Sequence, residues 1–342
     1  MRTRLLGRTG IRVSPFCLGT MMFGAAGNAD HDECVAMVHR ALDSGINIVD
    51  TADVYSGSES EVILGKALKG RRDDVVLATK GNGRMGGDPN RVGSSRRWIT
   101  TAVEDSLRRL QVDHIDLYQI HHPDPDTDVE ETLGALTDLL RSGKVRAIGA
   151  SNSTATEIVE AQWTSERRGL ARYRTEQPPY SILNRAIERD VLPTCQSYGL
   201  GTLVWGPLSM GLLTGKYRKG HTIQNARMRW VPRHLTDAHT LDVVERLLAL
   251  ADEVGTPLTR LAMAFTIAHP AVTSAIIGPR TPAQLEDLLA GADTVLGEDV
   301  LDQLDVIAPP GADIGLLDVS PSPLAVSEVA RRRRPVEERA AA

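Results

Sequence analysis

The chain alternates about eight times between short apolar segments and amphipathic segments, and this alternation strongly constrains its fold. In the clearest unit, residues 46–66, the apolar run from Ile46 to Val49 ends at Asp50. A polar loop with Tyr55 and a helical pattern follow. The apolar segments are continuous, which is typical of parallel strands buried on both faces. Repetition of this unit through 342 residues favours a closed (β/α)8 TIM barrel over an open, doubly wound sheet.

The boundaries of the expected elements follow from the apolar periodicity and from the Gly and Pro residues between them. Residues 3–15 predict a β-hairpin around Gly7–Gly10. We expect strands at 16–18, 46–49, 75–78, 115–120, 145–150, 173–176, 202–205 and 274–277. We expect helices at 31–44, 58–68, 95–110, 128–142, 154–168, 185–198, 237–254, 257–268, 281–291 and 298–307.

The composition changes near the C-terminus, which divides the chain into a barrel domain at residues 1–308 and a tail at 309–342. The tail contains a Pro/Ser patch, four arginines at 331–334 and a terminal Ala run, and it is expected to be poorly ordered and flexible. The arginines could contact an acid or a nucleic acid, but a solvated charge run is the favoured interpretation. The formal net charge of −5 gives no argument for nucleic-acid or anionic-membrane binding.

The remaining composition favours a cytoplasmic protein. Arg2 and Arg4 are not followed by the apolar core of a secretory signal, and no apolar run reaches the roughly 18 residues of a membrane span. The three cysteines, Cys17, Cys34 and Cys195, are far apart and form no CxxC motif, which is typical of a reducing compartment.

Polar residues follow several expected strands, and in a parallel barrel these strand ends meet at one mouth. Asp50, Lys80 and His121 occupy such positions, and Tyr55 lies in a mouth loop. Singly, each has an ordinary structural interpretation as a helix cap, a solvated strand end, a packing histidine or a loop tyrosine. Their joint placement favours a functional site.

These four residue types suit one reaction. A phenol has a pKa of about 10, which a nearby lysine cation lowers, while an aspartate keeps that lysine charged and oriented. A histidine can donate a hydrogen bond to a carbonyl oxygen as negative charge develops there. The combination predicts hydride addition to a carbonyl carbon with proton donation by the phenol.

Other chemistries fit the sequence less well. We expect no metal site, because no Cys or His lies at zinc spacing, and the adjacent His121 and His122 are expected to point to opposite faces of a strand. Ser151 lacks the GxSxG context of a serine hydrolase. Residues 81–86, GNGRMG, match GxGxxG, but the loop-like GDPNRVGSS follows where a dinucleotide-binding helix would open, so a mobile loop is the favoured interpretation.

Several sequence blocks together resemble the aldo-keto reductase family across residues 1–307. They are GTMMFG (19–24), NIVDTADVYSGSESEVILGKAL (47–68), ATK (78–80), SLRRLQVDHIDLYQIHHPD (106–124), GKVRAIGASN (143–152), GPLSMGLLTGKY (206–217) and AIIGPRTPAQLEDLL (275–289). The resemblance implies a TIM barrel and a catalytic tetrad of Asp50, Tyr55, Lys80 and His121. In it Tyr55 is the general acid, Lys80 lowers the pKa of Tyr55, Asp50 pairs with Lys80, and His121 orients the carbonyl.

The resemblance also implies a nicotinamide cofactor. Trp205 stands where the residue that stacks on the nicotinamide is usually tyrosine or another aromatic, and Asp287 stands where many relatives have asparagine. The implied cofactor-binding residues are Gly19, Thr20, Met21, Asp50, Ser151, Asn152, Gln177, Trp205, Gly206, Pro207, Leu208, Gly211, Leu213, Lys216, Ile277, Gly278, Arg280, Gln284 and Asp287.

The adenosine end distinguishes the two nicotinamide cofactors. Arg280 and the helix start that follows it suit the extra phosphate of NADPH, and residues 278–282 contain no acid, so NADH is expected to bind more weakly. The expected partner is a small-molecule carbonyl substrate, with the oligomeric state left open. Two alternatives remain: a nicotinamide-binding regulatory subunit with little turnover, and a lyase or isomerase on the same barrel.

Overall fold

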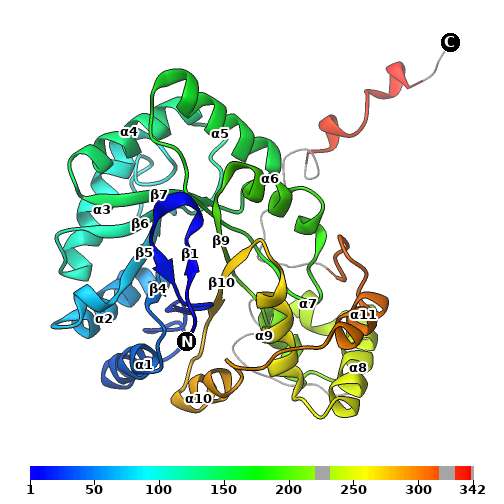
Figure 1. The fold of residues 1–342 in the computed structure, drawn as a ribbon. Coiled ribbons are helices and arrows are strands. Elements are labelled where there is room, and N and C mark those ends of the chain that lie inside the picture. Colours follow the sequence, from blue (N-terminus) through cyan, green and yellow to red (C-terminus); the bar gives the residue numbers. More distant parts are fainter. Residues whose placement is uncertain (220–231, 316–327, 340–342) are drawn as a thin grey trace.

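Eight parallel strands close into a barrel in the computed structural model, which describes residues 1–219, 232–315 and 328–339 (Figure 1). The strands follow one another in the order β10-β3-β4-β5-β6-β7-β8-β9, so the predicted TIM barrel is confirmed. The barrel strands are β3 (Phe16–Gly19), β4 (Ile48–Asp50), β5 (Val76–Gly81), β6 (Ile115–Ile120), β7 (Val145–Ser151), β8 (Thr175–Gln177), β9 (Gly201–Val204) and β10 (Val272–Ile277).

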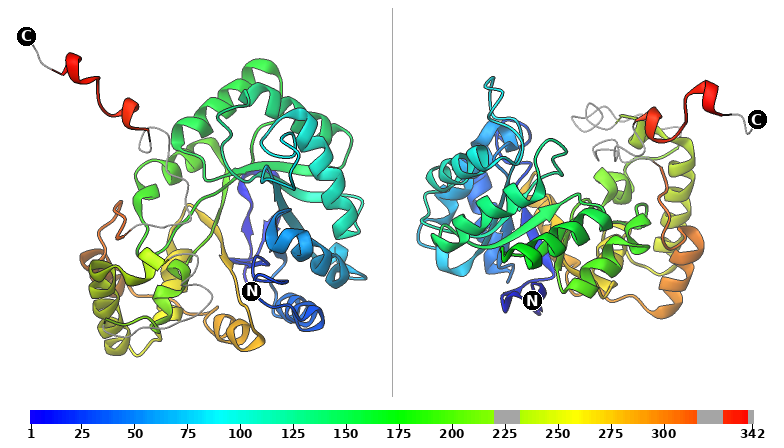
Figure 2. Two further views of the ribbon diagram at one scale, coloured as in Figure 1. Left: turned by 180° about the vertical axis from the view of Figure 1, so that it is seen from behind. Right: turned by 90° about the horizontal axis from the view of Figure 1, so that it is seen from above.

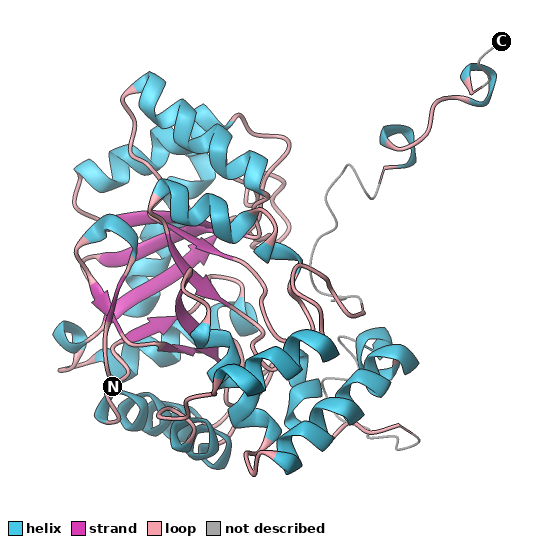
Figure 3. Cartoon of the chain, turned by 45° about the vertical axis from the view of Figure 1, so that its right-hand side comes forward, coloured by secondary structure: helices cyan, strands magenta, loops and turns pink. Residues whose placement is uncertain are grey.

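Helices surround the strands on the outside, as Figure 3 shows. Many begin at side-chain caps that the sequence provides: Asp30 accepts a hydrogen bond from the backbone N–H of Glu33, and Thr154 forms a reciprocal capping box with Glu157. None of the described helices is both long and apolar enough to cross a lipid bilayer. The helices are α1 (His31–Asp43), α2 (Glu59–Leu68), α3 (Arg96–Leu110), α4 (Val129–Arg141), α5 (Ala155–Arg168), α6 (Val191–Tyr198), α7 (Pro232–Thr236), α8 (Ala238–Glu253), α9 (Leu258–Ala268), α10 (Pro282–Ala290) and α11 (Glu298–Ile307).

The predicted hairpin closes one end of the barrel. Strands β1 (Arg4–Leu5) and β2 (Arg12–Val13) pair antiparallel, and the neighbouring Leu6 and Val13 are fully buried. They belong to a hydrophobic cluster that includes Leu117 of β6 and Leu203 of β9. A larger cluster fills the space between strands and helices. The strand N-termini are therefore sealed with apolar side chains, which leaves the opposite end for polar chemistry.

The helix expected at 185–198 is wrong in its first part. The structure has a short 3-10 turn, η4 (Ala186–Glu188), and then α6, which begins after its cap Asp190. The cause is Arg185, which is buried. Its guanidinium pairs with Glu188 at 2.8 Å and with Asp305 of α11 at 2.7 Å, so it ties this segment to the C-terminal helix.

The first described residues after the expected boundary at residue 309 contact the barrel. The N–H of Ile314 donates to the carbonyl of Leu183 at 2.7 Å, the N–H of Arg185 donates to the carbonyl of Ala312, and Ile314 is buried. Residues 311–314 therefore pack on the barrel because their backbone groups are paired there. The residues at 328–339 are exposed and lie away from the barrel (Figures 1 and 2).

This difference predicts two outcomes for truncation. Ending the chain at residue 315 removes residues 316–342 and is expected to leave the midpoint of thermal unfolding unchanged, because the described part of that segment, residues 328–339, is exposed. Ending it at residue 308 is expected to lower the free energy of unfolding by about 1.5–3 kcal/mol from the loss of Ile314 alone. Equal midpoints for the two truncated proteins would show that residues 311–314 do not stabilise the barrel.

Candidate active site

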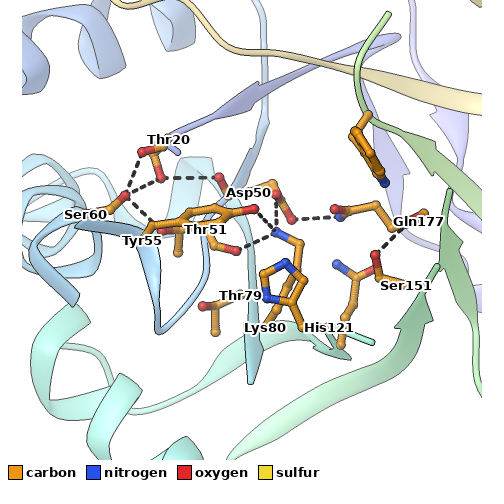
Figure 4. Close-up of polar contacts among 12 residues, drawn as sticks. Thr20, Asp50, Thr51, Tyr55, Ser60, Thr79, Lys80, His121, Ser151 and Gln177 are labelled. Carbon is orange, nitrogen blue, oxygen red and sulfur yellow. Dashed lines mark hydrogen bonds and ion pairs between the residues drawn. The ribbon is translucent and has the colours of Figure 1, made fainter. Parts of the chain in front are cut away.

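The four residues predicted for catalysis meet at the C-terminal mouth of the barrel (Figure 4). Asp50 ends β4, Lys80 lies near the end of β5, and His121 directly follows β6. The Nζ atom of Lys80 lies 2.6 Å from Oδ2 of Asp50 and 3.2 Å from the hydroxyl of Tyr55. Neighbouring parallel strands end together, and their last side chains therefore converge.

Lys80 has no exposure to solvent, and its ammonium group is fully used. It donates to Asp50, to the hydroxyl of Tyr55 and to the backbone carbonyl of Thr51 at 2.7 Å. An ammonium group has three N–H donors, and each of them has an acceptor here, so none is left without a partner. Burial is the largest single influence and lowers the pKa of Lys80. The charges of Asp50 and Tyr55 and the hydrogen bonds to both together outweigh it, so the pKa lies above its usual value and Lys80 is a cation.

The predicted lowering of the Tyr55 pKa by Lys80 is only one of several influences on this pKa. Burial of the phenol is the largest influence and raises the pKa of Tyr55 above its usual value. Lys80 lowers this pKa through its charge and its hydrogen bond, as predicted, and Asp50 raises it. Tyr55 is therefore a protonated phenol at neutral pH, ready to donate its proton.

His121 is a neutral imidazole. Burial, followed by the charge of Lys80, lowers its pKa well below the usual value. Its ring lies edge-on to Tyr55, with 5.8 Å between the centroids and 79° between the planes. A neutral ring in this position can donate one N–H to a carbonyl oxygen that faces Tyr55.

The expectation that His121 and His122 point to opposite faces is wrong. Both line the same cleft, and their rings stack in parallel with centroids 4.6 Å apart and 6° between planes. The alternation rule applies inside a strand, whereas β6 ends at Ile120, before both histidines. His122 therefore extends the flat surface that the His121 ring presents to the cleft.

Opposite Tyr55, side-chain amides and an indole form a connected wall. Nε2 of Gln177 donates to Oδ1 of Asp50 at 2.9 Å. The hydroxyl of Ser151 donates to the backbone carbonyl of Gln177 at 2.8 Å. Nε1 of Trp205 donates to Oδ1 of Asn152 at 3.2 Å. The backbone φ of Asn152 is +62°, a left-handed conformation that asparagine tolerates better than most residues. These contacts fix the wall before any ligand binds.

The loop that carries Tyr55 is held by its serines. Tyr55 opens the turn η2 (Tyr55–Ser58), in which Ser56 has a φ of +49°. The Ser56 hydroxyl donates to the carbonyl of Phe23 at 2.7 Å. Ser60 lies 2.8 Å from the Thr20 hydroxyl and 3.1 Å from that of Thr51. This buried hydroxyl chain supports the segment whose carbonyl accepts from Lys80.

The mouth continues into a cleft of about 550 Å³ between the loop after β9 and the loop after β10. The predicted residues that line it are Gly19, Met21, Asp50, Tyr55, His121, Ser151, Asn152, Gln177, Trp205, Gly206, Pro207, Leu208, Gly211, Lys216, Ile277, Gly278, Gln284 and Asp287.

Four predicted residues do not line the cleft. Thr20 and Lys80 are buried next to it: the Thr20 hydroxyl donates to the backbone carbonyl of Asp50, and the Lys80 ammonium donates to the Asp50 carboxylate and the Tyr55 hydroxyl. Leu213 is buried in the core, and Arg280 is exposed. The lining residues that sequence reasoning missed are Met22, His122, Met210, Thr214, Thr259, Met263, Ile276, Pro279 and Leu288. Most are apolar side chains, and seven of the nine lie within the sequence blocks quoted above, next to residues that were predicted; only Thr259 and Met263 lie outside those blocks.

The far end of the cleft meets the start of α10. Thr281 caps this helix, and Oε1 of Gln284 accepts the N–H of Arg280 at 2.8 Å. Nδ2 of Asn28 donates to the carbonyl of Arg280 at 3.0 Å, which joins the loop after β3 to the loop after β10. Asp287 lies 3.9 Å from Arg260, so its carboxylate is paired within the chain.

Comparison with known proteins agrees with this geometry. A sequence model of the aldo/keto reductase family matches residues 15–309. An uncharacterized oxidoreductase, YrpG of Bacillus subtilis, is 41% identical over 92% of this chain and 98% of its own. A probable voltage-gated potassium channel subunit beta of Oryza sativa is 35% identical over 90% of this chain and 96% of its own. The versiconal hemiacetal acetate reductase of Aspergillus parasiticus is 31% identical, with coverage of 88% and 95%.

Proposed function

Because the chain belongs to the aldo/keto reductase family, we propose that it reduces an aldehyde or ketone to an alcohol with NADPH, and that Tyr55 is the proton donor. One observation carries the proposal. The Lys80 ammonium joins Asp50 to the Tyr55 hydroxyl, and both of these residues line a cleft of about 550 Å³ at the barrel mouth. Such a cation beside a phenol strengthens it as an acid.

The residues of the cleft fit a nicotinamide cofactor by their chemistry. Ser151, Asn152 and Gln177 place a hydroxyl and two side-chain amides beside Asp50, which suits a carboxamide with both donors and acceptors. Trp205 offers a flat apolar surface next to them. A reduced nicotinamide held there would supply the hydride that adds to the carbonyl carbon.

The chain's own groups then act on the carbonyl oxygen. The neutral His121 donates a hydrogen bond that orients the carbonyl and stabilises negative charge on the oxygen. Tyr55 transfers its hydroxyl proton to that oxygen, while the Lys80 cation stabilises the phenolate that remains. Asp50, held by Gln177, keeps the ammonium in place during the transfer.

Arg280 is proposed to select NADPH by contacting its extra phosphate. The side chain is exposed beside the capped start of α10, where backbone N–H groups also favour an anion. Replacing Arg280 with alanine is expected to weaken NADPH binding by about 1.5–3 kcal/mol and to leave NADH binding nearly unchanged. Dissociation constants of both cofactors for wild type, Arg280→Ala and Arg97→Ala, an exposed arginine on α3, measure this. Equal losses for the two cofactors would contradict the assignment.

The second candidate function is a nicotinamide-binding regulatory subunit, which is favoured by the relatives named as potassium channel beta subunits. A panel of aldehydes and ketones, followed by the absorbance of reduced nicotinamide, separates the candidates. Turnover of one or more carbonyls supports the reductase. Tight cofactor binding with no turnover across the panel would favour the regulatory subunit, and the absence of both would contradict the two proposals together.

A further inference from the structure

Asp53 has a buried carboxyl that the proposed reaction does not use, and it lies next to the residues proposed for catalysis. Asp53 is 1% exposed, and neither of its carboxyl oxygens makes a hydrogen bond of normal distance and angle among the described residues; the backbone N–H of Val54 acts on the carboxyl as a donor. Asp53 precedes Tyr55 by two residues on the same loop, and its N–H donates to the carbonyl of Lys80 at 3.0 Å. An acid so enclosed and unpaired is costly to ionise, so it needs an explanation.

Two polar groups meet at Gly81, the residue after Lys80. A Cβ atom on Gly81 would lie 1.9 Å from the hydroxyl of Tyr118 and 3.4 Å from an oxygen of Asp53. The Tyr118 hydroxyl is also buried and has no hydrogen-bond partner among the described residues. Gly81 therefore leaves the space in which this carboxyl and this phenol approach the strand that carries Lys80.

The other charged groups around Asp53 are already paired. Glu61 of α2 is fully buried, accepts from Thr79 at 2.6 Å and pairs with Arg109 of α3 at 2.6 Å. Lys80 is bound to Asp50. Burial is the largest influence on the pKa of Asp53 and, with the charge of Glu61, raises it to about 7 against the opposing effects of Arg109, the backbone N–H of Val54 and Lys80.

We propose that Asp53 is a positioning residue whose charge adjusts the acidity of Tyr55. In this proposal Asp53 is uncharged in acidic solution and negatively charged in alkaline solution. The proposal rests on the role of Tyr55 as proton donor. An ionised Asp53 raises the pKa of Tyr55, in addition to the larger effects of burial, Lys80 and Asp50. Tyr55 then keeps its proton to higher pH, so carbonyl reduction persists further into the alkaline range.

Asp53→Asn tests this because it removes the charge and keeps the shape. The alkaline limb of the pH profile of kcat/KM is expected to move to lower pH by on the order of 0.5–1 unit, the scale of a single nearby charge. Below about pH 5.5 the profiles of the variant and the wild type are expected to coincide, since Asp53 is then protonated in the wild type and the side chain at position 53 is neutral in both proteins. Asp53→Ser is expected to shift the limb in the same direction, and Asp113→Asn, whose side chain is 92% exposed, is the control. Superimposable profiles for wild type and both Asp53 variants would overturn the proposal.

A second measurement needs no turnover. A carboxyl whose pKa is raised on folding loses stability as pH rises from its unfolded value of about 4 to its folded value of about 7. The stability advantage of Asp53→Asn over wild type is therefore expected to grow across this range and to stay constant above it. Tyrosinate absorbance, corrected with Tyr55→Phe, is expected to show Tyr55 ionising at lower pH in Asp53→Asn. If no carbonyl is reduced, the proposed function fails, while this titration still decides whether the charge of Asp53 acts on Tyr55.

Discussion

Replacing Tyr55 with phenylalanine is expected to lower kcat for carbonyl reduction by about 10²–10⁴-fold, the usual contribution of a general acid. The variant removes the hydroxyl that lies 3.2 Å from Nζ of Lys80 and keeps the aromatic ring that packs on His121. Cofactor binding is expected to change little, because Gln177, Asn152 and Trp205 stay held by their own hydrogen bonds. Steady-state kinetics and a cofactor dissociation constant measure the two effects separately.

Tyr198→Phe is the matched control for this prediction. Tyr198 ends α6, is 39% exposed and does not line the cleft, so its loss of a hydroxyl is expected to leave kcat unchanged. If Tyr55→Phe retains turnover close to that of Tyr198→Phe, the proton must come from another group, and the assignment of the acid is wrong.

Replacing Lys80 with methionine is expected to have the largest effect on stability, because it leaves the carboxylate of Asp50 buried without its cation. Breaking a buried ion pair in this way costs about 3–5 kcal/mol. The pKa of Lys80 is raised in the folded chain, so the contribution of the ammonium is fully present at neutral pH and is lost only in strongly alkaline solution. Chemical denaturation at neutral pH measures the loss, with the exposed Lys69→Met as control.

The same variant is expected to change the pH profile of any residual reduction. Lys80 lowers the pKa of Tyr55, so its removal raises that pKa and moves the alkaline limb to higher pH. Combining Lys80→Met with Asp50→Asn is expected to recover part of the stability, since no charge is then buried alone, but not the activity. An unchanged limb in Lys80→Met would show that the ammonium does not act on the phenol.

The barrel and the centre of the site could be predicted from the sequence because both depend on local patterns. Continuous apolar runs indicated the parallel strands, and polar residues at their ends indicated the mouth. Asp50, Lys80 and His121 follow this rule directly, and their convergence needs only the parallel arrangement of β4, β5 and β6.

The features that could not be predicted depend on contacts between distant segments. Arg185 interrupts a helical pattern because it pairs with Asp305, which is 120 residues away. Met210 reaches the cleft from a turn in which its φ is +56°, a conformation that apolar periodicity does not indicate. The composition of residues 311–314 resembles a linker and predicts a tail, whereas Ile314 is buried against the barrel.

The three contacts of the Lys80 ammonium also bear on how Tyr55 would regain its proton in the proposed reaction. In the proposed reaction the phenolate of Tyr55 regains a proton after each turnover, and the fully buried Lys80 gives it no direct contact with solvent. The Thr51 carbonyl has no proton to give, and Asp50 is bound beyond Lys80 to the amide of Gln177. Within the described residues the open side of Tyr55 is the cleft itself. For the proposed reaction, we therefore expect the alcohol to leave and water to enter from the mouth before the next turnover begins.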